Sequence, residues 1–310
     1  MSAKTQALIR DTARDLGFRT NPSARALPTG RTNTIGVVVS NMTNPVMFEL
    51  VRDMHRAAEE HGYTVILAES EQGDGHVADR LDRILAAVDG AILTMTDLVD
   101  ERIQELSEAR PVVLVNRRVQ GVPDVAPDLR PAVRRALAEL HDRGHRSVAY
   151  LSAAAGWWAS EQRWDLLMPE ALALGMSIIE IGPNEPDRGG GAVTLPRVRA
   201  SGATAVITFN DLMAIGVLDA IGTEGGQVPK DLSIVSFDNM FGSDFTSPPL
   251  TTIDTRRFEI GEAAMHRLIG IIGPSEDMGP PAHEPIIGTL VVRGSVGPGP
   301  AAGVVSTRND

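Results

Sequence analysis

The residues with the clearest chemical potential are polar side chains that directly follow short, β-branched apolar runs. In an open parallel sheet, ligands bind beyond the carboxyl ends of the strands, so side chains in these positions converge on one cleft. Hydroxyl, amide and carboxylate groups gathered there predict a hydrogen-bonding site for a small polar ligand. The candidates are Ser40, Asn41, Glu69, Ser70, Thr96, Asp97, Asn116, Arg117, Asn210, Asp211 and Asp238.

Each of these residues also has a purely local interpretation. Ser, Asn and Asp favour strand-to-helix turns and helix caps on local grounds, so a single one of them does not identify a site. Asp211 is the weakest candidate, because it could cap the helix predicted for L-M-A-I-G-V-L-D-A-I. The prediction therefore depends on several of them meeting.

Motifs for catalysis, cofactors and metals are missing from the sequence. It has no Walker loop, no G-x-G-x-x-G after a strand, no H-E-x-x-H and no G-x-S-x-G, so we expect no enzyme and no cofactor. His141 and His145 have i, i+4 spacing, but Gly144 breaks the helix between them, and no metal is expected there. Gly189, Gly190 and Gly191 follow no strand and indicate a flexible loop rather than a phosphate cradle. Zero cysteines exclude disulfides and thiolate metal sites.

The elements that must position the polar residues alternate between strands and helices. This alternation predicts α/β lobes, each a doubly wound parallel sheet covered on both faces. One series has strands near 34–40, 63–69, 90–95 and 111–115, with helices near 45–61, 77–88 and 99–109. A second has strands near 147–151, 177–181, 203–209 and 232–237, with helices near 160–174, 192–200 and 211–223.

Composition fits a two-domain globular protein. The chain has 310 residues, of which 43% are hydrophobic and 22% charged. No apolar run approaches a membrane span or a secretory signal, so we expect a cytoplasmic protein with no membrane partner. The stretch from Gly294 is rich in Gly, Pro and Ala and predicts a disordered tail, assigned to residues 298–310.

Basic charge is concentrated at the N-terminus of an acidic chain. The net charge is −11, yet residues 1–33 carry six basic and two acidic side chains, a net +4 against −15 for the remainder. Ile9, Ala13 and Leu16 predict a short amphipathic helix. A one-turn helix after Pro22 is stopped by Pro28. A basic patch of this kind suits DNA phosphates, although a short solvated helix with a few arginines is the alternative.

Sequence motifs along nearly the whole chain resemble the LacI/GalR family of bacterial transcription regulators. They are R-D-L-G-F-R-T-N-P-S-A-R-A-L-P-T-G-R-T-N-T-I-G-V-V-V, N-P-V-M-F-E-L-V, R-G-H-R-S-V-A-Y-L, T-F-N-D-L-M-A-I-G, S-F-D-N, P-P-L-T-T-I and V-V-R-G-S. The resemblance implies a periplasmic-binding-protein-like core with three crossings between its lobes. A headpiece and hinge would span 1–33, the first lobe 34–126 plus 255–284, and the second 127–254 plus 285–297.

The resemblance also assigns effector contacts. Arg163, Asn210 and Asp238 match family positions that bind the effector, with Asn41, Met47, Asn116 and Trp158 as further expected contacts. Charge-assisted hydrogen bonds from a buried arginine and aspartate would suit a sugar-like or nucleobase-like effector. An inter-lobe salt bridge between Arg163 and Asp238, without ligand, is the alternative. No metal or cofactor is implied.

Several positions depart from the family pattern and leave the effector's identity open. Asn41 and Asn116 stand where Asp is frequent, and Val46 and Met47 stand where paired phenylalanines are usual. Trp157, Trp158 or Trp164 could instead supply an aromatic surface for a sugar ring, although packing in a lobe core is the usual fate of tryptophan.

The family mechanism would be effector-controlled operator binding by a homodimer, with Leu27 inserted in the minor groove. DNA contacts are expected from Thr5, Arg19, Asn21, Ser23, Arg25, Ala26 and Leu27. Family members carry a helix-turn-helix before the first helix seen here, so we expect that Met1 is an internal codon read as the start and that operator binding needs the full headpiece. A headless cytoplasmic ligand sensor or sugar-binding protein is the alternative.

Overall fold

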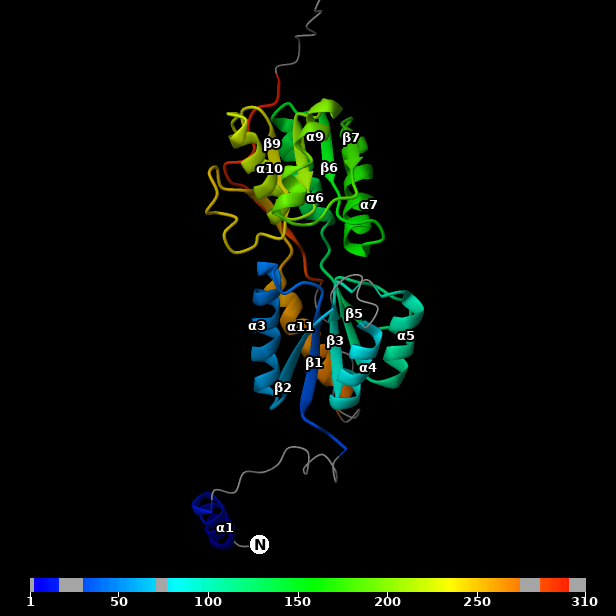
Figure 1. Ribbon diagram of the computed structural model, residues 1–310, viewed down its shortest axis with the longest axis vertical. Helices are drawn as coiled ribbons and strands as arrows, with labels where there is room; N and C mark the ends of the chain where they lie inside the picture. The colour runs from blue at the N-terminus through cyan, green and yellow to red at the C-terminus, as the bar shows by residue number, and fades with distance from the viewer. Residues whose placement is uncertain (1–2, 17–29, 71–76, 97, 274–284, 301–310) are drawn as a thin grey trace, which may run out of the picture.

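Two parallel-sheet lobes make up most of the computed structural model, which describes residues 3–16, 30–70, 77–96, 98–273 and 285–300. The lobes lie one above the other along the long axis (Figure 1). Helix α1 (Ala3–Asp15) precedes them in the chain. The described parts contain no helix long and apolar enough to cross a membrane.

The first lobe is a five-stranded parallel sheet in the order β2-β1-β3-β4-β5. Its strands are β1 (Thr34–Val39), β2 (Thr64–Glu69), β3 (Gly90–Thr94), β4 (Val112–Val115) and β5 (Asp124–Val125). Side chains of β1 alternate between two cores. Ile35, Val37 and Val39 pack under α3 (Pro45–Glu60) and α11 (Arg257–Ile272). Val38 packs under α4 (Val77–Ala87) and α5 (Asp100–Ala109).

The second lobe is a six-stranded sheet in the order β11-β10-β9-β8-β6-β7. All neighbours are parallel except β11, which runs antiparallel to β10. Its strands are β6 (Ser147–Leu151), β7 (Ser177–Ile181), β8 (Ala205–Thr208), β9 (Ser233–Phe237), β10 (Thr251–Asp254) and β11 (Thr289–Val291). Helices α6 (Arg130–Asp142) and α7 (Trp158–Ala173) cover one face. Helices α9 (Leu195–Ser201) and α10 (Asp211–Thr223) cover the other, where α8 (Arg188–Ala192) packs on α10.

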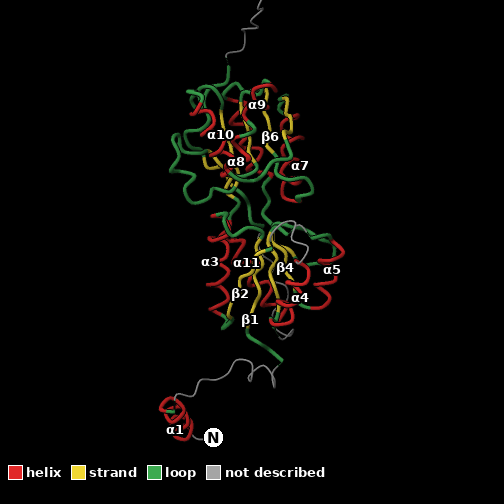
Figure 2. Tube along the Cα trace, viewed as in Figure 1, coloured by secondary structure: helices red, strands yellow, loops and turns green. Residues whose placement is uncertain are grey.

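Three segments connect the lobes side by side (Figure 2). The chain passes up between β5 and α6, down between β10 and α11, and up again before β11. Asp128 on the first segment forms a parallel bridge with Ile287 on the third. The carboxyl ends of the strands in both sheets therefore face each other across the connection, which is where ligand sites form in such folds.

Several sequence predictions need correction. Helices α6 and α8 and strands β5 and β10 were not predicted, while the helix expected at 192–200 corresponds to α9. The glycines at 189–191 are helical rather than a flexible loop, and Gly190 and Gly191 are buried. Residues 294–300 are packed rather than disordered, since Ser295 is fully buried and the amide of Gly299 donates to the carbonyl of Arg143. The remainder of the expected tail lies outside the described residues.

Candidate functional site

A cavity of about 370 Å³ lies between the two lobes, within the size range of small-molecule sites. Five of the strand-end candidates line it. Ser40, Asn41 and Glu69 come from the first lobe, and Asn210 and Asp238 come from the second. Arg163, from α7, joins them. Ser70, Thr96, Asn116, Arg117 and Asp211 do not line it, and Asp97 lies outside the described residues.

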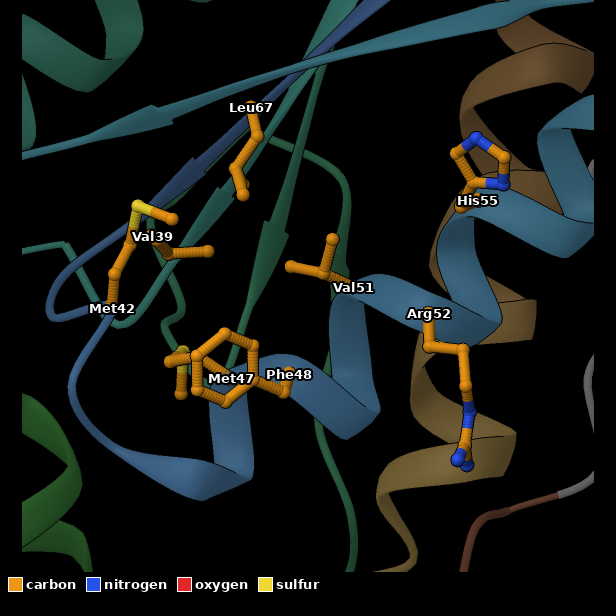
Figure 3. A pocket seen from close by; sticks show the side chains of 8 residues that line it. All are labelled: Val39, Met42, Met47, Phe48, Val51, Arg52, His55 and Leu67. Carbon is orange, nitrogen blue, oxygen red and sulfur yellow. The ribbon is translucent and has the colours of Figure 1, made fainter.

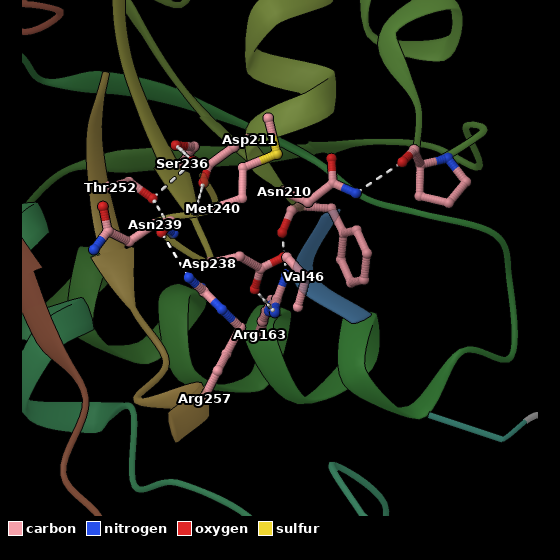
Figure 4. A network of polar contacts seen from close by, with 12 residues as sticks. Val46, Arg163, Asn210, Asp211, Ser236, Asp238, Asn239, Met240, Thr252 and Arg257 are labelled. Atoms are coloured by element: carbon pink, nitrogen blue, oxygen red, sulfur yellow. Dashed lines mark hydrogen bonds and ion pairs between the residues drawn. The ribbon is translucent and has the colours of Figure 1, made fainter. Parts of the chain in front are cut away.

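Arg163 and Asp238 form a buried ion pair at the second-lobe wall of the cavity (Figure 4). Arg163 Nη2 donates to Asp238 Oδ1 at 2.8 Å, and Nη1 donates to the carbonyl of Phe209. The guanidinium carbon lies 4.4 Å and 4.5 Å from the ring centroids of Phe209 and Phe237, in cation–π contact. Both partners belong to one lobe, so the alternative of an inter-lobe salt bridge is wrong.

The backbone at Asp238 is held in an uncommon conformation. Its φ of 102° and that of Met95, 45°, are positive, and both residues line the cavity just after strands β9 and β3. Non-glycine residues adopt such angles only where the surrounding structure enforces them, and they cluster at functional sites.

Asn210, rather than Asp211, caps helix α10. Its Oδ1 accepts from the amide of Met213 at 2.9 Å, and its Nδ2 donates to the carbonyl of Pro186 at 2.7 Å. Asp211 is instead fully buried, where it accepts hydrogen bonds from Thr252, Ser236 and the amide of Met240. Burial, followed by the charge of Asp238, raises the pKa of Asp211 to about 6.

This pKa predicts a pH-dependent stability that Asp211→Asn removes. The unfolded chain releases the proton near pH 4 and the folded protein near pH 6, so the folded state holds more protons between these values. The contribution of Asp211 to the free energy of unfolding therefore falls by about 3 kcal/mol as pH rises through this window. Denaturant unfolding of both proteins from pH 4 to 7.5 measures the difference in slope. If the free energy of unfolding changes with pH in the same way in both proteins, the raised pKa of Asp211 is contradicted.

The other predicted contacts are dispersed. Asn41 lines the cavity and accepts from the amide and hydroxyl of Thr43. Met47 is buried in the first-lobe core, where its sulfur accepts from the hydroxyl of Thr94 at 3.8 Å. Asn116 follows β4 outside the cavity lining. Of the three tryptophans, Trp157 lines the cavity, Trp158 begins α7 without lining it, and Trp164 stacks on Tyr150 in the core.

Sequence reasoning missed the loop between β7 and α8. Glu185, Pro186 and Asp187 line the cavity opposite the first lobe. Asp187 is the N-cap of α8 and accepts from the amide of Gly190 at 2.7 Å. The signal was present, because the predicted strand at 177–181 ends just before this polar stretch, but its carboxyl end was not included among the candidates.

Arg257 connects the lobes beside the cavity. Its Nε and Nη2 donate to Glu49 Oε2 on α3 of the first lobe, and Nη2 also donates to the carbonyl of Asn239 at 2.7 Å. Asn239 follows Asp238, and Figure 4 shows Arg257 beside both of them. Arg257 therefore joins the residues next to the ion pair to Glu49 on α3.

Replacing Arg257 by Ala should loosen this connection. We expect the free energy of unfolding to fall by about 2 kcal/mol, because charge-assisted hydrogen bonds in a mostly buried setting are lost. The neighbouring Arg256→Gln removes only a more exposed pair with Glu259 and should change little. Denaturant unfolding compares the two, and equal losses would contradict an inter-lobe role for Arg257.

Taken together, two parallel-sheet lobes with a polar cavity at their facing strand ends have the arrangement in which open α/β folds bind small ligands. Within the described residues, no three His, Cys, Asp or Glu side chains are placed to hold a metal ion. His145 is buried and its ring contacts Thr204 and the carbonyl of Gly297, whereas the half-buried ring of His141 lies against Asp142.

Comparison with known proteins agrees with this core. Residues 137–296 match the periplasmic binding protein-like domain family. The chain is 29% identical over 273 residues to catabolite control protein A of Priestia megaterium, covering 85% of this chain and 82% of that protein. It is 28% identical over 284 residues to the transcriptional repressor CytR of Escherichia coli, covering 87% and 81%. The chain belongs to the LacI/GalR family of transcriptional regulators.

Solved structures share the fold. The lac repressor dimer bound to operator and an anti-inducer superimposes with a TM-score of 0.84 at 22% identity, covering 96% of this chain and 91% of that one. A complex of the regulator CelR with cellobiose gives 0.75 at 24% identity, covering 95% and 91%. A LacI-family regulator from Enterococcus faecium with bound ribose gives 0.76 at 23%, covering 86% and 99%.

Proposed function

We propose that the chain is an effector-responsive transcriptional repressor of the cytoplasm, in which a small polar ligand binds between the lobes and alters operator binding by a homodimer. The observation that carries the proposal is the Arg163–Asp238 pair on the cavity wall. Asp238 Oδ2 accepts no hydrogen bond from any described residue and is available to a ligand hydroxyl or amine. Ligands of this polar kind, cellobiose and ribose, occupy relatives of the same fold.

An apolar outer face of the first lobe supports the homodimer. A cavity of about 330 Å³ lies between α3 and the edge strand β2, lined by Val39, Met42, Met47, Phe48, Val51, Arg52, His55 and Leu67 (Figure 3). Phe48 is 62% exposed, and Ile66 and Leu67 of β2 are also exposed. An exposed apolar patch beside an unpaired strand edge is typical of a protein–protein interface.

Phe48→Asp tests this surface. A charge in the centre of an apolar interface is buried without a partner, so we expect the dimer dissociation constant to rise at least a hundredfold. Analytical ultracentrifugation measures it, with Phe245→Asp on the second lobe as the comparison. An unchanged dimer, or a monomeric parent protein, would exclude this face as the interface.

Helix α3 links the two sites physically. Its N-cap, Asn44, lines the cavity, while Phe48 and Val51 of the same helix line the outer apolar face. A ligand that draws the lobes together therefore changes the placement of a dimer-interface helix. A tenfold change in operator affinity requires a differential binding energy of about 1.4 kcal/mol between the two arrangements.

The N-terminal segment is tied to the far end of the first lobe. Asp89 accepts hydrogen bonds from the amide and hydroxyl of Thr32 and from the amide of Asn33. Movements of the lobe are thus passed to the segment proposed to hold DNA. Thr5 is an exposed residue of α1, while Arg19, Asn21, Ser23, Arg25, Ala26 and Leu27 lie outside the described residues.

A thermal-shift panel of sugars, polyols, amino sugars, sugar phosphates and nucleosides tests the function. A ligand present at 100 times its dissociation constant stabilises the folded state by about 2.7 kcal/mol. We expect a ligand from this panel to raise Tm and to change retention of promoter DNA by a chain carrying its full headpiece. A ligand that binds without altering DNA retention would favour a sensor that does not act on DNA. No shift with any compound would contradict the proposed ligand class.

A further inference from the structure

The cavity between the lobes is strongly acidic. Its lining contains four carboxylates, Glu69, Glu185, Asp187 and Asp238, against one guanidinium, that of Arg163, a net charge of −3. The cationic group is also the most fully neutralised, because it is buried against Asp238, bonded to the carbonyl of Phe209 and covered by two aromatic rings. It presents no uncompensated positive charge to a ligand anion.

The carboxylates lie on both walls of the cavity. Glu69 ends β2 in the first lobe, and its Oε1 accepts from the amide of Met42 at 2.6 Å. Glu185 and Asp187 belong to the loop before α8 in the second lobe. When the lobes close, these like charges approach while water leaves, and their mutual repulsion grows. A ligand that favours closure must offset this repulsion.

Unused hydrogen-bond acceptors on the cavity wall also favour a ligand rich in donors. Asp238 Oδ2 and both carboxylate oxygens of Glu185 accept no hydrogen bond from the described residues. The Asn210 amide, by contrast, already uses its nitrogen and its oxygen within the protein. The buried Asp211 lies behind Asp238, and burial together with the nearby charge of Asp238 raises the pKa of Asp211. The wall therefore offers mainly acceptors, which suit a ligand rich in donors.

From this arrangement, and resting on the proposed function, we propose that the effector is a small polyhydroxylated molecule carrying a protonated amine, such as an amino sugar, and that phosphorylated or carboxylated sugars are excluded. Its hydroxyls bond Asp238 beside the face of Trp157, and its ammonium lies between the acidic walls. A metal cation is not the alternative, because no three carboxylates of the described chain are placed to coordinate one.

Matched probes test the ligand class. Glucosamine, galactosamine and mannosamine are titrated calorimetrically beside the corresponding neutral hexoses and hexose 6-phosphates. We expect an amino sugar to bind at least tenfold more tightly than its neutral counterpart, with affinity that falls as salt is raised, and no binding of the phosphates. A neutral hexose or a phosphate that binds as tightly as the amino sugar overturns the charge inference and leaves the proposed function standing. No binding in any of the three series overturns the amino-sugar proposal, while the proposed function still depends on the wider thermal-shift panel.

Charge-neutral variants locate the effect. Glu185→Gln with Asp187→Asn keeps the side-chain sizes and the acceptor that caps α8. It should lower the affinity for the amino sugar by roughly five- to tenfold more than the affinity for the neutral hexose. Glu180→Gln removes an exposed carboxylate of the same lobe that does not line the cavity, and should change neither. The proposal is overturned if the double variant and Glu180→Gln lose equal affinity for the amino sugar. It is also overturned if the double variant loses equal affinity for the amino sugar and the neutral hexose.

Discussion

Replacing Arg163 by Ala should abolish ligand binding and lower the free energy of unfolding by about 3–5 kcal/mol. The change leaves the buried carboxylate of Asp238 without its counter-charge, which is the costly way to break a buried ion pair. It also removes the group that holds Asp238 and the carbonyl of Phe209 in place on the cavity wall. Calorimetric titration and denaturant unfolding measure the two effects.

A double-mutant cycle measures the coupling energy between Arg163 and Asp238. Asp238→Asn with Arg163→Ala should be less destabilising than the sum of the single changes, because the unpaired charge is gone. Arg134→Ala serves as the matched control, since it breaks an ion pair with Glu170 on the exposed surface of α6 and should leave stability and binding nearly unchanged. Undiminished affinity in Arg163→Ala would remove this residue from the site.

Gly216→Ala should destabilise the second lobe by about 3 kcal/mol and weaken ligand binding. A Cβ at position 216 would lie 2.0 Å from the carbonyl oxygen of Arg188, so α10 and α8 could not keep their present distance. A Cβ added at Gly191 in α8 would likewise lie 2.1 Å from the carbonyl oxygen of Met213. Because Asp187 on the cavity wall is the N-cap of α8, moving α8 away from α10 also displaces this carboxylate.

Gly222→Ala is the control on the same helix. It lies near the end of α10 with nothing within 4 Å of its added Cβ, so the substitution should stabilise the protein by about 0.5–1 kcal/mol through helix propensity. Denaturant unfolding compares the two alanines. Gly216→Ala as stable as the parent protein would show that α8 and α10 separate at little cost, contrary to the packing described here.

The sequence predicted the lobes well because their strands are short, β-branched and buried. Continuous apolar runs such as TIGVVV are typical of parallel strands whose two faces are both covered by helices. Helix α6 was not predicted because it follows an inter-lobe crossing, so no expected strand comes directly before it. The glycines at 189–191 were misjudged because their role is tertiary: they let α8 approach α10, which no local pattern reveals.

The site was predicted in part for a similar reason. The carboxyl-end rule found Asn41, Asn210 and Asp238, since it requires only the strand ends. It wrongly included Asn116, and the family resemblance wrongly assigned Met47 and Trp158 to the cavity lining, which contains the adjacent Trp157 instead. These outcomes depend on lobe packing. The acidic loop at 185–187 contributes through its position opposite the first lobe, which only the assembled fold defines.

The most direct test of the central claim is a distance measured between the lobes. The chain contains no cysteine, so Glu101→Cys on α5 and Glu161→Cys on α7 can be spin-labelled selectively on the two sides of the cleft. We predict that a bound ligand shortens this distance in the parent protein and leaves it unchanged in the Arg163→Ala variant. An identical distance distribution with and without a saturating, bound ligand would contradict lobe closure as the basis of regulation.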